Sequence, residues 1–350
     1  MAPTVTGQRP PRLEVAMRPT YRPRALGYAG RWNPMHHDPA LAKNLLPVLL
    51  DACKGHLGDV SWFRADWQRG GASTGRAMWT VQGERPCEVV VKFPVVPKEL
   101  FWTRRLQSAD GSRPSVIPHL FASGTTLGHY DLAWIVIERL SCGPLGLRWH
   151  RDHIDRVADA AARFHFETAP LPVEDEQGRI EDWEPLLERA REAVRDNHIA
   201  SRARWTDAIK QVQRMHDKLV ERWRGRDTTH WIHGDLHLAN AMSRDSAQSG
   251  PVVLIDLAEV RPGHWTEDAV YLERQLWGRR DRLEATKPVR AMARARRKLG
   301  LVAEKAGHEL ADIRRILMAA TAPAFLKSEG HPRYLAGALK QLHEAIERHR

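Results

Sequence analysis

Three side chains that could perform phosphoryl transfer lie close together in the second half of the sequence. Residues 231–240 read Trp-Ile-His-Gly-Asp-Leu-His-Leu-Ala-Asn, and the apolar run at 252–255 leads directly to Asp256. Transfer of a phosphoryl group from a nucleotide to a hydroxyl needs one carboxylate that accepts the hydroxyl proton, together with an amide and a second carboxylate that hold Mg²⁺. Asp235, Asn240 and Asp256 provide these groups, so the pattern predicts a phosphotransferase.

The spacing suits the positions that these groups must take. Asn240 follows Asp235 by five residues, which lets a loop direct one side chain toward the substrate and the other back toward the metal. Asp256 ends a β-branched apolar strand, whose buried residues would fix the position of the carboxylate. A single aspartate after a strand is more often a turn residue or a helix cap. The prediction therefore depends on the three residues occurring together.

These residues belong to a longer pattern that resembles the signature of a known family. The pattern comprises His233-Gly234-Asp235-Leu236-His237, Asn240, Ile255-Asp256, Gly263 and Asp268. It is similar to that of aminoglycoside phosphotransferases and their kinase-like relatives, which include choline, fructosamine, homoserine and methylthioribose kinases. Upstream, residues 89–93 resemble the strand that supplies a phosphate-binding lysine, and residues 135–140 resemble the linker strand against which adenine stacks. The resemblance extends over residues 58–275.

The resemblance implies an α+β, protein-kinase-like bilobal fold, with a small antiparallel-sheet N-lobe and a large, mainly helical C-lobe. It also implies an ATP-dependent kinase with an alcohol group as acceptor, using ATP and Mg²⁺. In the family pattern Asp235 is the catalytic base, and Asn240 and Asp256 are the magnesium ligands. Lys92 would contact the α and β phosphates of ATP. Asp268 corresponds to a structural aspartate, although an acidic residue there is also typical of an ordinary helix N-terminus.

Further nucleotide-binding residues are expected in the N-lobe. Glu99 is the best partner for Lys92, because Pro97 suits the first turn of a helix and lets Glu99 face back toward the strand. The segment 70–75, Gly-Gly-Ala-Ser-Thr-Gly, lies between two strand-like runs, as a phosphate-covering hairpin would. The prediction comprises Lys92, Glu99, Gly71, Ser73, Thr74, Glu138 and Leu140. The alternatives are an edge-strand lysine and an ordinary turn; the turn is no Walker loop, because no Gly-Lys-Ser or Gly-Lys-Thr follows.

Two other site types fit the catalytic segment less well. His233 and His237 could share a zinc ion on a helix, but Gly234 between them favours a loop, and the glutamate of a metalloprotease motif is missing. A protein kinase would have Phe-Gly after Asp256, an arginine before Asp235 and an Ala-Pro-Glu motif further on. Their absence favours a small-molecule hydroxyl acceptor, such as a sugar, a nucleoside, an amino-alcohol or an aminoglycoside-like compound.

The net charge of +11 raises two alternatives. Residues 279–298 carry nine basic and two acidic side chains, a composition that could bind nucleic acid, an acidic partner or a phosphorylated substrate. One alternative is therefore a non-catalytic kinase-like binding protein that uses this basic helix, and the other is a kinase acting on a macromolecule. A solvated helical face is favoured, because no aromatic residues are interleaved for base stacking. Nucleic acid is thus not expected as a partner.

The remaining organisation follows from these anchors. We expect an extended N-terminal arm at residues 1–40, an N-lobe at 41–137, a hinge at 138–143 and a helical C-lobe with the acceptor pocket at 144–350. Predicted strands lie near 60–67, 76–82, 87–93, 118–125 and 132–138. Predicted helices lie near 41–57, 97–107 and 157–166, with two more between 183 and 223.

The acceptor pocket is expected in residues 181–224 and 264–345. A polycationic aminoglycoside would need several carboxylates there, and the candidates are Glu181, Asp182, Glu184, Glu188, Glu267, Asp268 and Glu273. Basic residues in the same regions are at least as numerous, which favours a neutral or anionic acceptor. Five tryptophans, at positions 183, 205, 223, 265 and 277, could surround a cationic group, although core packing explains most tryptophans.

The composition indicates a soluble, cytoplasmic protein. No apolar run approaches the roughly 20 residues that cross a bilayer, and the N-terminus lacks the hydrophobic stretch of a signal peptide, so no membrane contact is expected. Cys53, Cys87 and Cys142 are widely spaced and odd in number, which indicates a reducing compartment and no disulfide framework.

Overall fold

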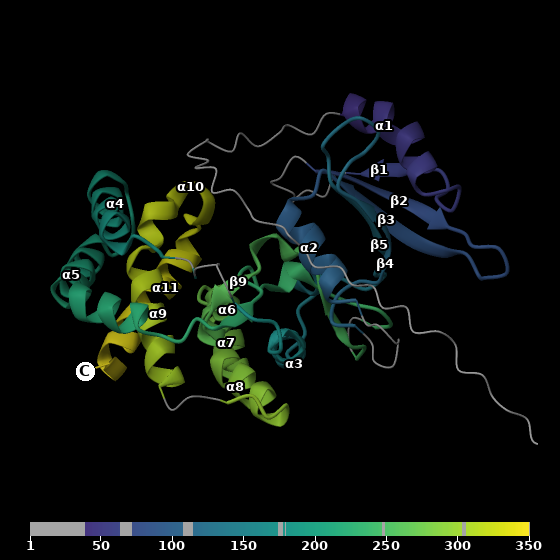
Figure 1. Cartoon of the computed structure of the whole chain (residues 1–350). Coiled ribbons are helices and arrows are strands. Elements are labelled where there is room, and N and C mark those ends of the chain that lie inside the picture. Colours follow the sequence, from purple (N-terminus) through teal and green to yellow (C-terminus); the bar gives the residue numbers. More distant parts are fainter. Residues whose placement is uncertain are drawn as a thin grey trace, which may run out of the picture.

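The computed structural model describes residues 39–63, 72–107, 115–173, 178, 180–246, 249–302 and 306–349. These residues form a small antiparallel sheet near the N-terminal end and a larger, mainly helical part (Figure 1). The expected α+β architecture with two unequal lobes is therefore confirmed. The predicted N-terminal arm lies almost entirely outside the described residues.

Five strands form the sheet of the N-lobe in the order β1-β2-β3-β5-β4, and every neighbouring pair is antiparallel. They are β1 (Ser61–Phe63), β2 (Ser73–Trp79), β3 (Cys87–Phe93), β4 (Leu120–Gly124) and β5 (Trp134–Glu138). Successive side chains of β3 point to opposite faces, so Val89 and Val91 are buried with helix α1 (Pro39–Ala52) on one side. Lys92 lies on the other face, where helix α2 (Pro97–Arg105) packs Leu100 against Ile135. The two helices thus cover the two faces of the sheet (Figure 1).

The N-lobe differs from the sequence prediction at two places. Strand β2 begins at Ser73 rather than near 76, because Ser73 and Thr74 already pair with β3. Helix α1 ends at Ala52 rather than at 57, because Lys54 and Gly55 have positive φ angles of 55° and 75°. A right-handed helix cannot contain such residues.

The C-lobe is built from helices around one large apolar core. Its helices are α3 (His153–Thr168), α4 (Trp183–Asp196), α5 (Arg202–Arg224), α6 (Trp265–Arg274), α7 (Arg280–Thr286), α8 (Pro288–Lys298), α9 (Gly307–Ala320), α10 (Leu326–Glu329) and α11 (Pro332–His349), with 3₁₀ turns at Leu145–Leu147 and Ala322–Phe325. The two helices expected between 183 and 223 are α4 and α5. Trp205, Trp223 and Trp277 are fully buried, and Trp183 and Trp265 nearly so. These five tryptophans therefore belong mainly to the core.

Two short ribbons carry the polar loops of the C-lobe. Strand β6 (His230–Ile232) pairs with β9 (Arg261–Gly263), and β7 (Ala241–Ser243) pairs with β8 (Val252–Leu254). The loop 233–240 runs from β6 to β7 and ends in a 3₁₀ turn at Leu238–Asn240; the segment 255–260 runs from β8 to β9 with a similar turn at Leu257–Glu259. Because both loops join the same two ribbons, they are held side by side.

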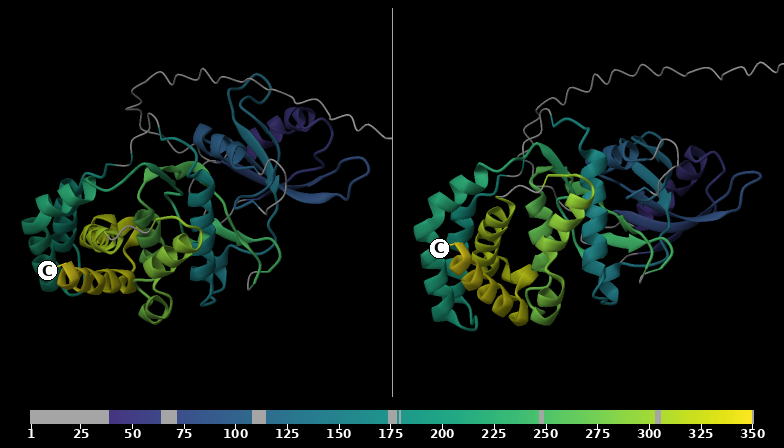
Figure 2. Two further views of the ribbon diagram at one scale, coloured as in Figure 1. Left: turned by 60° about the horizontal axis from the view of Figure 1, so that its bottom comes forward. Right: turned by 90° about the horizontal axis from the view of Figure 1, so that it is seen from below.

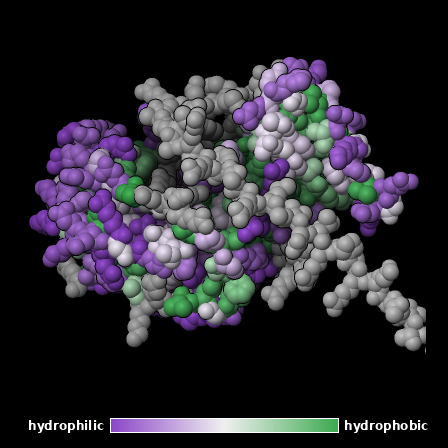
Figure 3. All heavy atoms as spheres, in the orientation of Figure 1, coloured by the Kyte–Doolittle hydropathy of each residue, from purple (hydrophilic) through white to green (hydrophobic). Residues whose placement is uncertain are grey.

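The helices of the C-lobe extend away from the sheet, with α4 and α5 at the far end (Figure 2). The surface over this end is mainly hydrophilic (Figure 3). Among the described residues, no helix is both long and apolar enough to cross a membrane. All three cysteines carry free thiols.

Candidate active site

The structure brings the two loops with the predicted catalytic and metal-binding residues into contact. The Ile255 N–H donates a hydrogen bond of 3.0 Å to the carbonyl of Asn240. Asp256 follows immediately, so its backbone lies beside the loop that carries Asp235. The side chain of Asp256 is 46% exposed, and its φ of 64° turns the chain sharply away from the strand direction. A half-exposed carboxylate on such a turn is open to ligands.

Three neighbours hold the Asp235 carboxylate. The Asn240 Nδ2 donates to both the carbonyl and Oδ2 of Asp235, each at 3.0 Å. The His237 Nδ1 accepts from the Asn240 N–H, so the ring proton resides on Nε2, which lies 3.4 Å from the same Oδ2. Burial raises the pKa of Asp235, but hydrogen bonds from His237 and Tyr271 outweigh it and lower the pKa below its usual value. The carboxylate is therefore ionised at neutral pH.

The free oxygen atoms of this cluster suit a magnesium ion. Because Nδ2 of Asn240 is used by Asp235, the amide Oδ1 remains as an acceptor, and Asp256 adds carboxylate oxygens; both are ligand types that Mg²⁺ prefers. No group of three or more His, Cys, Asp or Glu in the described part of the chain could hold a metal by itself. Magnesium usually takes its remaining ligands from phosphate and water. The donor set therefore fits an ion that arrives with a nucleotide.

Lys92 connects the N-lobe to this cluster. Its Nζ lies 2.6 Å and 2.8 Å from the two carboxylate oxygens of Glu99, and 3.6 Å from Oδ1 of Asp256. Pro97 occupies the first turn of α2, which places Glu99 over the strand as the sequence indicated. Burial lowers the pKa of Lys92, but the two carboxylates outweigh burial and raise the pKa. Lys92 therefore remains a cation in the interior.

Asp268 holds the backbone at the start of the loop 233–240. The Oδ2 atom accepts from the His233 N–H and Oδ1 accepts from the Gly234 N–H, both at 2.9 Å, and His165 Nε2 lies 3.1 Å from Oδ2. Burial raises the pKa of Asp268, but the hydrogen bonds of His165 and the backbone outweigh it and lower the pKa. With a 1% exposed side chain, Asp268 is structural, near the start of α6.

Gly234 is required by the close approach of the two loops. Its φ is +80°, and a Cβ added there would lie 2.1 Å from the carbonyl oxygen of Glu259. Any other residue would be strained in this conformation and would also push the two loops apart.

Among the other predicted nucleotide-binding residues, Ser73 and Thr74 lie in a strand rather than in the expected turn. Ser73 is buried and Thr74 lies in β2 opposite Lys92, so neither forms a phosphate-covering turn. Gly71 lies outside the described residues. The carboxylate of Glu138 accepts from Arg244 at 2.9 Å and from the His119 N–H, which leaves it engaged in a structural contact.

Leu140, also predicted to bind the nucleotide, is 7% exposed in the segment between the lobes. The sequence alone could not show that the Glu138 carboxylate is engaged, because its partner, Arg244, lies far along the chain.

The two histidines of the zinc alternative have other partners. His233 Nε2 lies 3.1 Å from the Ile255 carbonyl, while His237 contacts Asp235 and the Asn240 N–H. His233 thus connects the loop 233–240 to the segment before Asp256, and His237 holds Asp235 and Asn240 within that loop.

The basic segment 279–298 forms two helices, α7 and α8, rather than one, and much of its charge is paired within the chain. Arg280 contacts Glu344, Arg294 contacts Asp155, and Lys298 contacts Asp159. Arg282 stacks on Trp149. The pairing weakens the interpretation of this segment as a docking surface.

Arg296 was not identified from the sequence, although it is 4% exposed and contacts His165. The spacing of apolar residues in α8 could have indicated its burial. Val289, Met292 and Arg296 recur at helical spacing on the buried face of α8, so the arginine occupies a core position.

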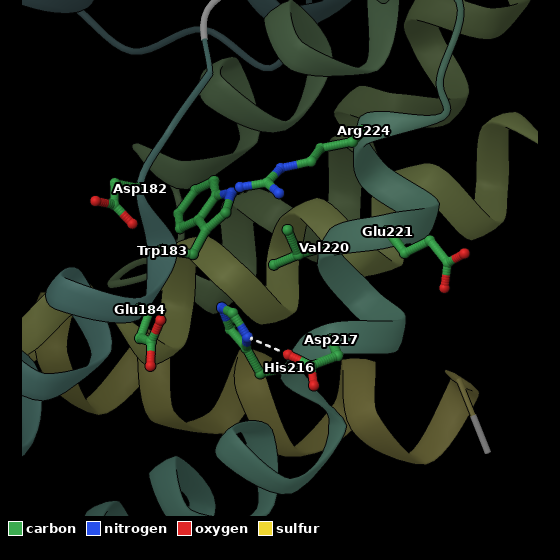
Figure 4. Close-up of a pocket in the computed structure, with 8 residues that line it drawn as sticks. All are labelled: Asp182, Trp183, Glu184, His216, Asp217, Val220, Glu221 and Arg224. Atoms are coloured by element: carbon green, nitrogen blue, oxygen red, sulfur yellow. Dashed lines mark hydrogen bonds and ion pairs between the residues drawn. The ribbon is translucent and has the colours of Figure 1, made fainter.

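Most carboxylates expected to meet a polycation are already engaged by other groups of the chain. Four of them form ion pairs with arginines: Glu181 with Arg314, Glu188 with Arg191, Glu267 with Arg226 and Glu273 with Arg315. Asp268 accepts a hydrogen bond from His165. Asp182 and Glu184 line a hollow of about 480 Å³ between α4 and α5. Figure 4 shows Asp182 and Glu221 pointing away from this hollow, so the carboxylates do not converge on a ligand.

Comparison with known proteins places this geometry in a family. Residues 78–300 match the model of a phosphotransferase enzyme family, and this range contains Lys92, Asp235, Asn240, Asp256 and Asp268. The chain belongs to this family. No curated protein matches the phosphotransferase closely enough to be significant.

Solved structures show that the phosphotransferase has the protein-kinase-like fold. A microcompartment-associated aminopropanol kinase superposes with a TM-score of 0.60 at 15% identity, over 89% of this chain and 98% of that chain. An aminoglycoside phosphotransferase from Alicyclobacillus acidocaldarius gives 0.50 at 16% identity, over 84% and 90%. The GDP complex of aminoglycoside 2'-phosphotransferase-IIIa gives 0.50 at 14% identity, over 89% and 100%. At these identities the similarity establishes the fold.

Proposed function

We propose that this phosphotransferase transfers the γ-phosphate of ATP, as its magnesium complex, to a hydroxyl group of a small molecule. The observation that carries the proposal is the position of Lys92, which contacts Glu99 and Asp256 at the point where the loop of Asp235 and Asn240 meets that of Asp256. Positioning and charge stabilisation account for most of the catalysis of phosphoryl transfer. A cation, two metal-ligand candidates and a base gathered from separate segments suit that chemistry.

Asp235 is the proposed base. Its low pKa keeps it ionised, so it can accept a hydrogen bond from the acceptor hydroxyl and direct the oxygen toward the phosphorus. The transition state of such transfers is loose, and the hydroxyl proton becomes acidic late in the reaction. A weak base that is rigidly held by Asn240 and His237 is sufficient for this role.

Asn240 and Asp256 are the proposed magnesium ligands, and Lys92 is the proposed phosphate contact. When bound, the ion neutralises the charge that develops on the phosphate oxygens. Lys92 is held in place by Glu99, which keeps the ammonium charged, and its Nζ also lies 3.6 Å from Asp256. The phosphates would therefore meet positive charge from both lobes, from Lys92 of the N-lobe and from the ion held by Asn240 and Asp256 of the C-lobe.

The proposed acceptor is a neutral or anionic hydroxyl compound, such as a sugar or a nucleoside. A polycation would need unpaired carboxylates around the acceptor, whereas Glu181, Glu267 and Glu273 are buried in ion pairs with arginines. Separating such buried pairs costs about 3–5 kcal/mol each. The charge pattern therefore disfavours an aminoglycoside.

The test measures release of labelled phosphate from ATP to water, and then to a panel of hydroxyl compounds, with and without Mg²⁺. Asp235→Asn should reduce both rates by about 10²–10⁴-fold while the affinity for magnesium-ATP stays close to that of the wild type. Asp207→Asn, at an exposed position of α5, is the matched control and should retain full activity. Wild-type turnover by Asp235→Asn would refute the assignment.

A second variant tests the metal ligands. Asp256→Asn should lose magnesium-dependent nucleotide binding, measured as thermal stabilisation by ATP. Tight magnesium-ATP binding by this variant would contradict the role of Asp256. Incubation of the wild type with labelled ATP and a cell extract, followed by separation by size, shows whether the label enters small molecules or macromolecules.

A further inference from the structure

The C-terminal end of α8 contains an arginine that is buried among exposed basic neighbours. Arg294, Arg297 and Lys298 are exposed, whereas Arg296 is 4% exposed. Its Nη1 lies 3.1 Å from Nδ1 of His165, and its Nη2 donates to the carbonyl of Val302. Burying a guanidinium is costly unless its partners compensate, so this position calls for a physical explanation.

The guanidinium of Arg296 and the carboxylate of Asp268 together determine which nitrogen of His165 carries the proton. Arginine can only donate, so Nδ1 of His165 must accept, and the ring proton resides on Nε2. That N–H donates to Oδ2 of Asp268 at 3.1 Å. Burial, together with the nearby positive charge of Arg296, lowers the pKa of His165. The ring is therefore neutral and has one tautomer.

These contacts form a continuous relay that ends at the catalytic loop. Arg296 donates to His165, His165 donates to Asp268, and Asp268 accepts from the N–H groups of His233 and Gly234. Gly234 directly precedes Asp235. His165 and Asp268 are each buried, so water does not replace the hydrogen bonds within the relay.

We propose that Arg296 is a positioning residue for Asp235, acting through His165 and Asp268. The inference rests on the proposed function, because it assigns Arg296 a role in the reaction of that site. Without the guanidinium, Nδ1 of His165 loses its donor and the ring loses the contact that fixes its orientation, so its Nε2–H can move away from the Asp268 carboxylate. That arrangement would weaken the hold of Asp268 on the loop.

The experiment compares three variants by their rate of magnesium-ATP hydrolysis to water. Arg296→Met removes every donor and keeps much of the volume, and it should lower kcat by roughly 10–100-fold, as a small misplacement of the reacting groups does. The KM for ATP should change much less, because the contacts of Lys92 with Glu99 and Asp256 do not involve Arg296, His165 or Asp268. Arg296→Lys should recover part of kcat, and Arg297→Met, at the exposed neighbouring position, should match the wild type.

Nitrogen-15 NMR of labelled histidines gives a second readout that does not depend on turnover or on the folding of Arg296→Met. In the wild type, His165 should show a protonated Nε2 and an unprotonated Nδ1, with assignment by loss of the signal in His165→Gln. A protonated Nδ1, or Arg296→Met with the kcat of the wild type, overturns the relay. A wild type that neither binds nor hydrolyses magnesium-ATP, but has the expected tautomer, overturns the proposed function and leaves the relay as a structural element.

Discussion

Replacing Asp268 by asparagine tests how much the catalytic loop depends on one buried carboxylate. Asp268 accepts from three donors, with Oδ1 facing Gly234 N–H and Oδ2 facing both His233 N–H and His165. An asparagine has only one acceptor oxygen, so its NH₂ must face a donor. The less costly orientation places the NH₂ toward Gly234, because the opposite one would sacrifice two hydrogen bonds.

The cost of that orientation can be worked out from the contacts. A buried N–H without a partner costs about 1–3 kcal/mol, which applies to Gly234. The two remaining hydrogen bonds lose the negative charge of their acceptor, and charge-assisted bonds are roughly twice as strong as neutral ones, so each loses about 1 kcal/mol. The expected decrease in the free energy of unfolding is therefore about 3–5 kcal/mol.

Denaturant unfolding of Asp268→Asn measures this decrease, with Asp155→Asn as the control. Asp155 forms an ion pair with Arg294 at the surface, where both side chains are about half exposed, and its loss should cost about 0–1 kcal/mol. The folded pKa of Asp268 is lowered, so its contribution to stability is present above the usual aspartate pKa of about 3.9 and is lost as the pH falls through the folded pKa. A decrease no larger than that of the control would refute the reasoning.

Three further changes test other parts of the site. Gly234→Ala places a Cβ 2.1 Å from the Glu259 carbonyl oxygen at a φ of +80°. The backbone strain of about 1–2 kcal/mol and the displaced loop should lower both the melting temperature and kcat. A variant with an unchanged melting temperature and kcat would disprove the close approach of the two loops. Lys92→Met removes the cation between Glu99 and Asp256. In the phosphate-release assay, kcat should fall by about 10²–10³-fold. Retention of more than a tenth of the wild-type activity would contradict a contact between Lys92 and the phosphates. Because the pKa of Asp235 is lowered, kcat/KM should be flat between about pH 5 and 7 and fall only near or below about 3.9; an acid limb centred near pH 6 would exclude this carboxylate as the base.

The parts of the site that local sequence determines were predictable. The alternation of β3 places Lys92 on the face opposite Val89 and Val91, and Pro97 begins the helix that directs Glu99 to it. Strand residues before Asp256 and the short loop after β6 likewise lie where their apolar and polar residues predict. In each case the relevant neighbours are close in sequence.

The remainder depends on contacts between distant segments. Ser73 and Thr74 were expected in a turn, but pairing with β3 extends the strand through them. The basic segment was expected to form one solvated helical face; Arg294 and Lys298 are indeed exposed, but they also form ion pairs with acidic residues of α3. Composition reports the number of charges but not their partners, so neither outcome could be read from the segment itself.

Two kinds of contact hold the proposed base and the proposed metal ligand, and their burial suits different tasks. Arg296, His165 and Asp268 are each buried, with at most 4% exposure, so the hydrogen bonds between them are strong and hold the backbone beside Asp235. The contact from Lys92 to Asp256 is longer, at 3.6 Å, and its carboxylate is half exposed, so it is worth little. Asp256 can therefore exchange Lys92 for another cation at small cost, while Asp235, the proposed base, keeps its position. A proposed metal ligand must change partners in every turnover, whereas a base must not move, and the distribution of burial in this chain meets both requirements.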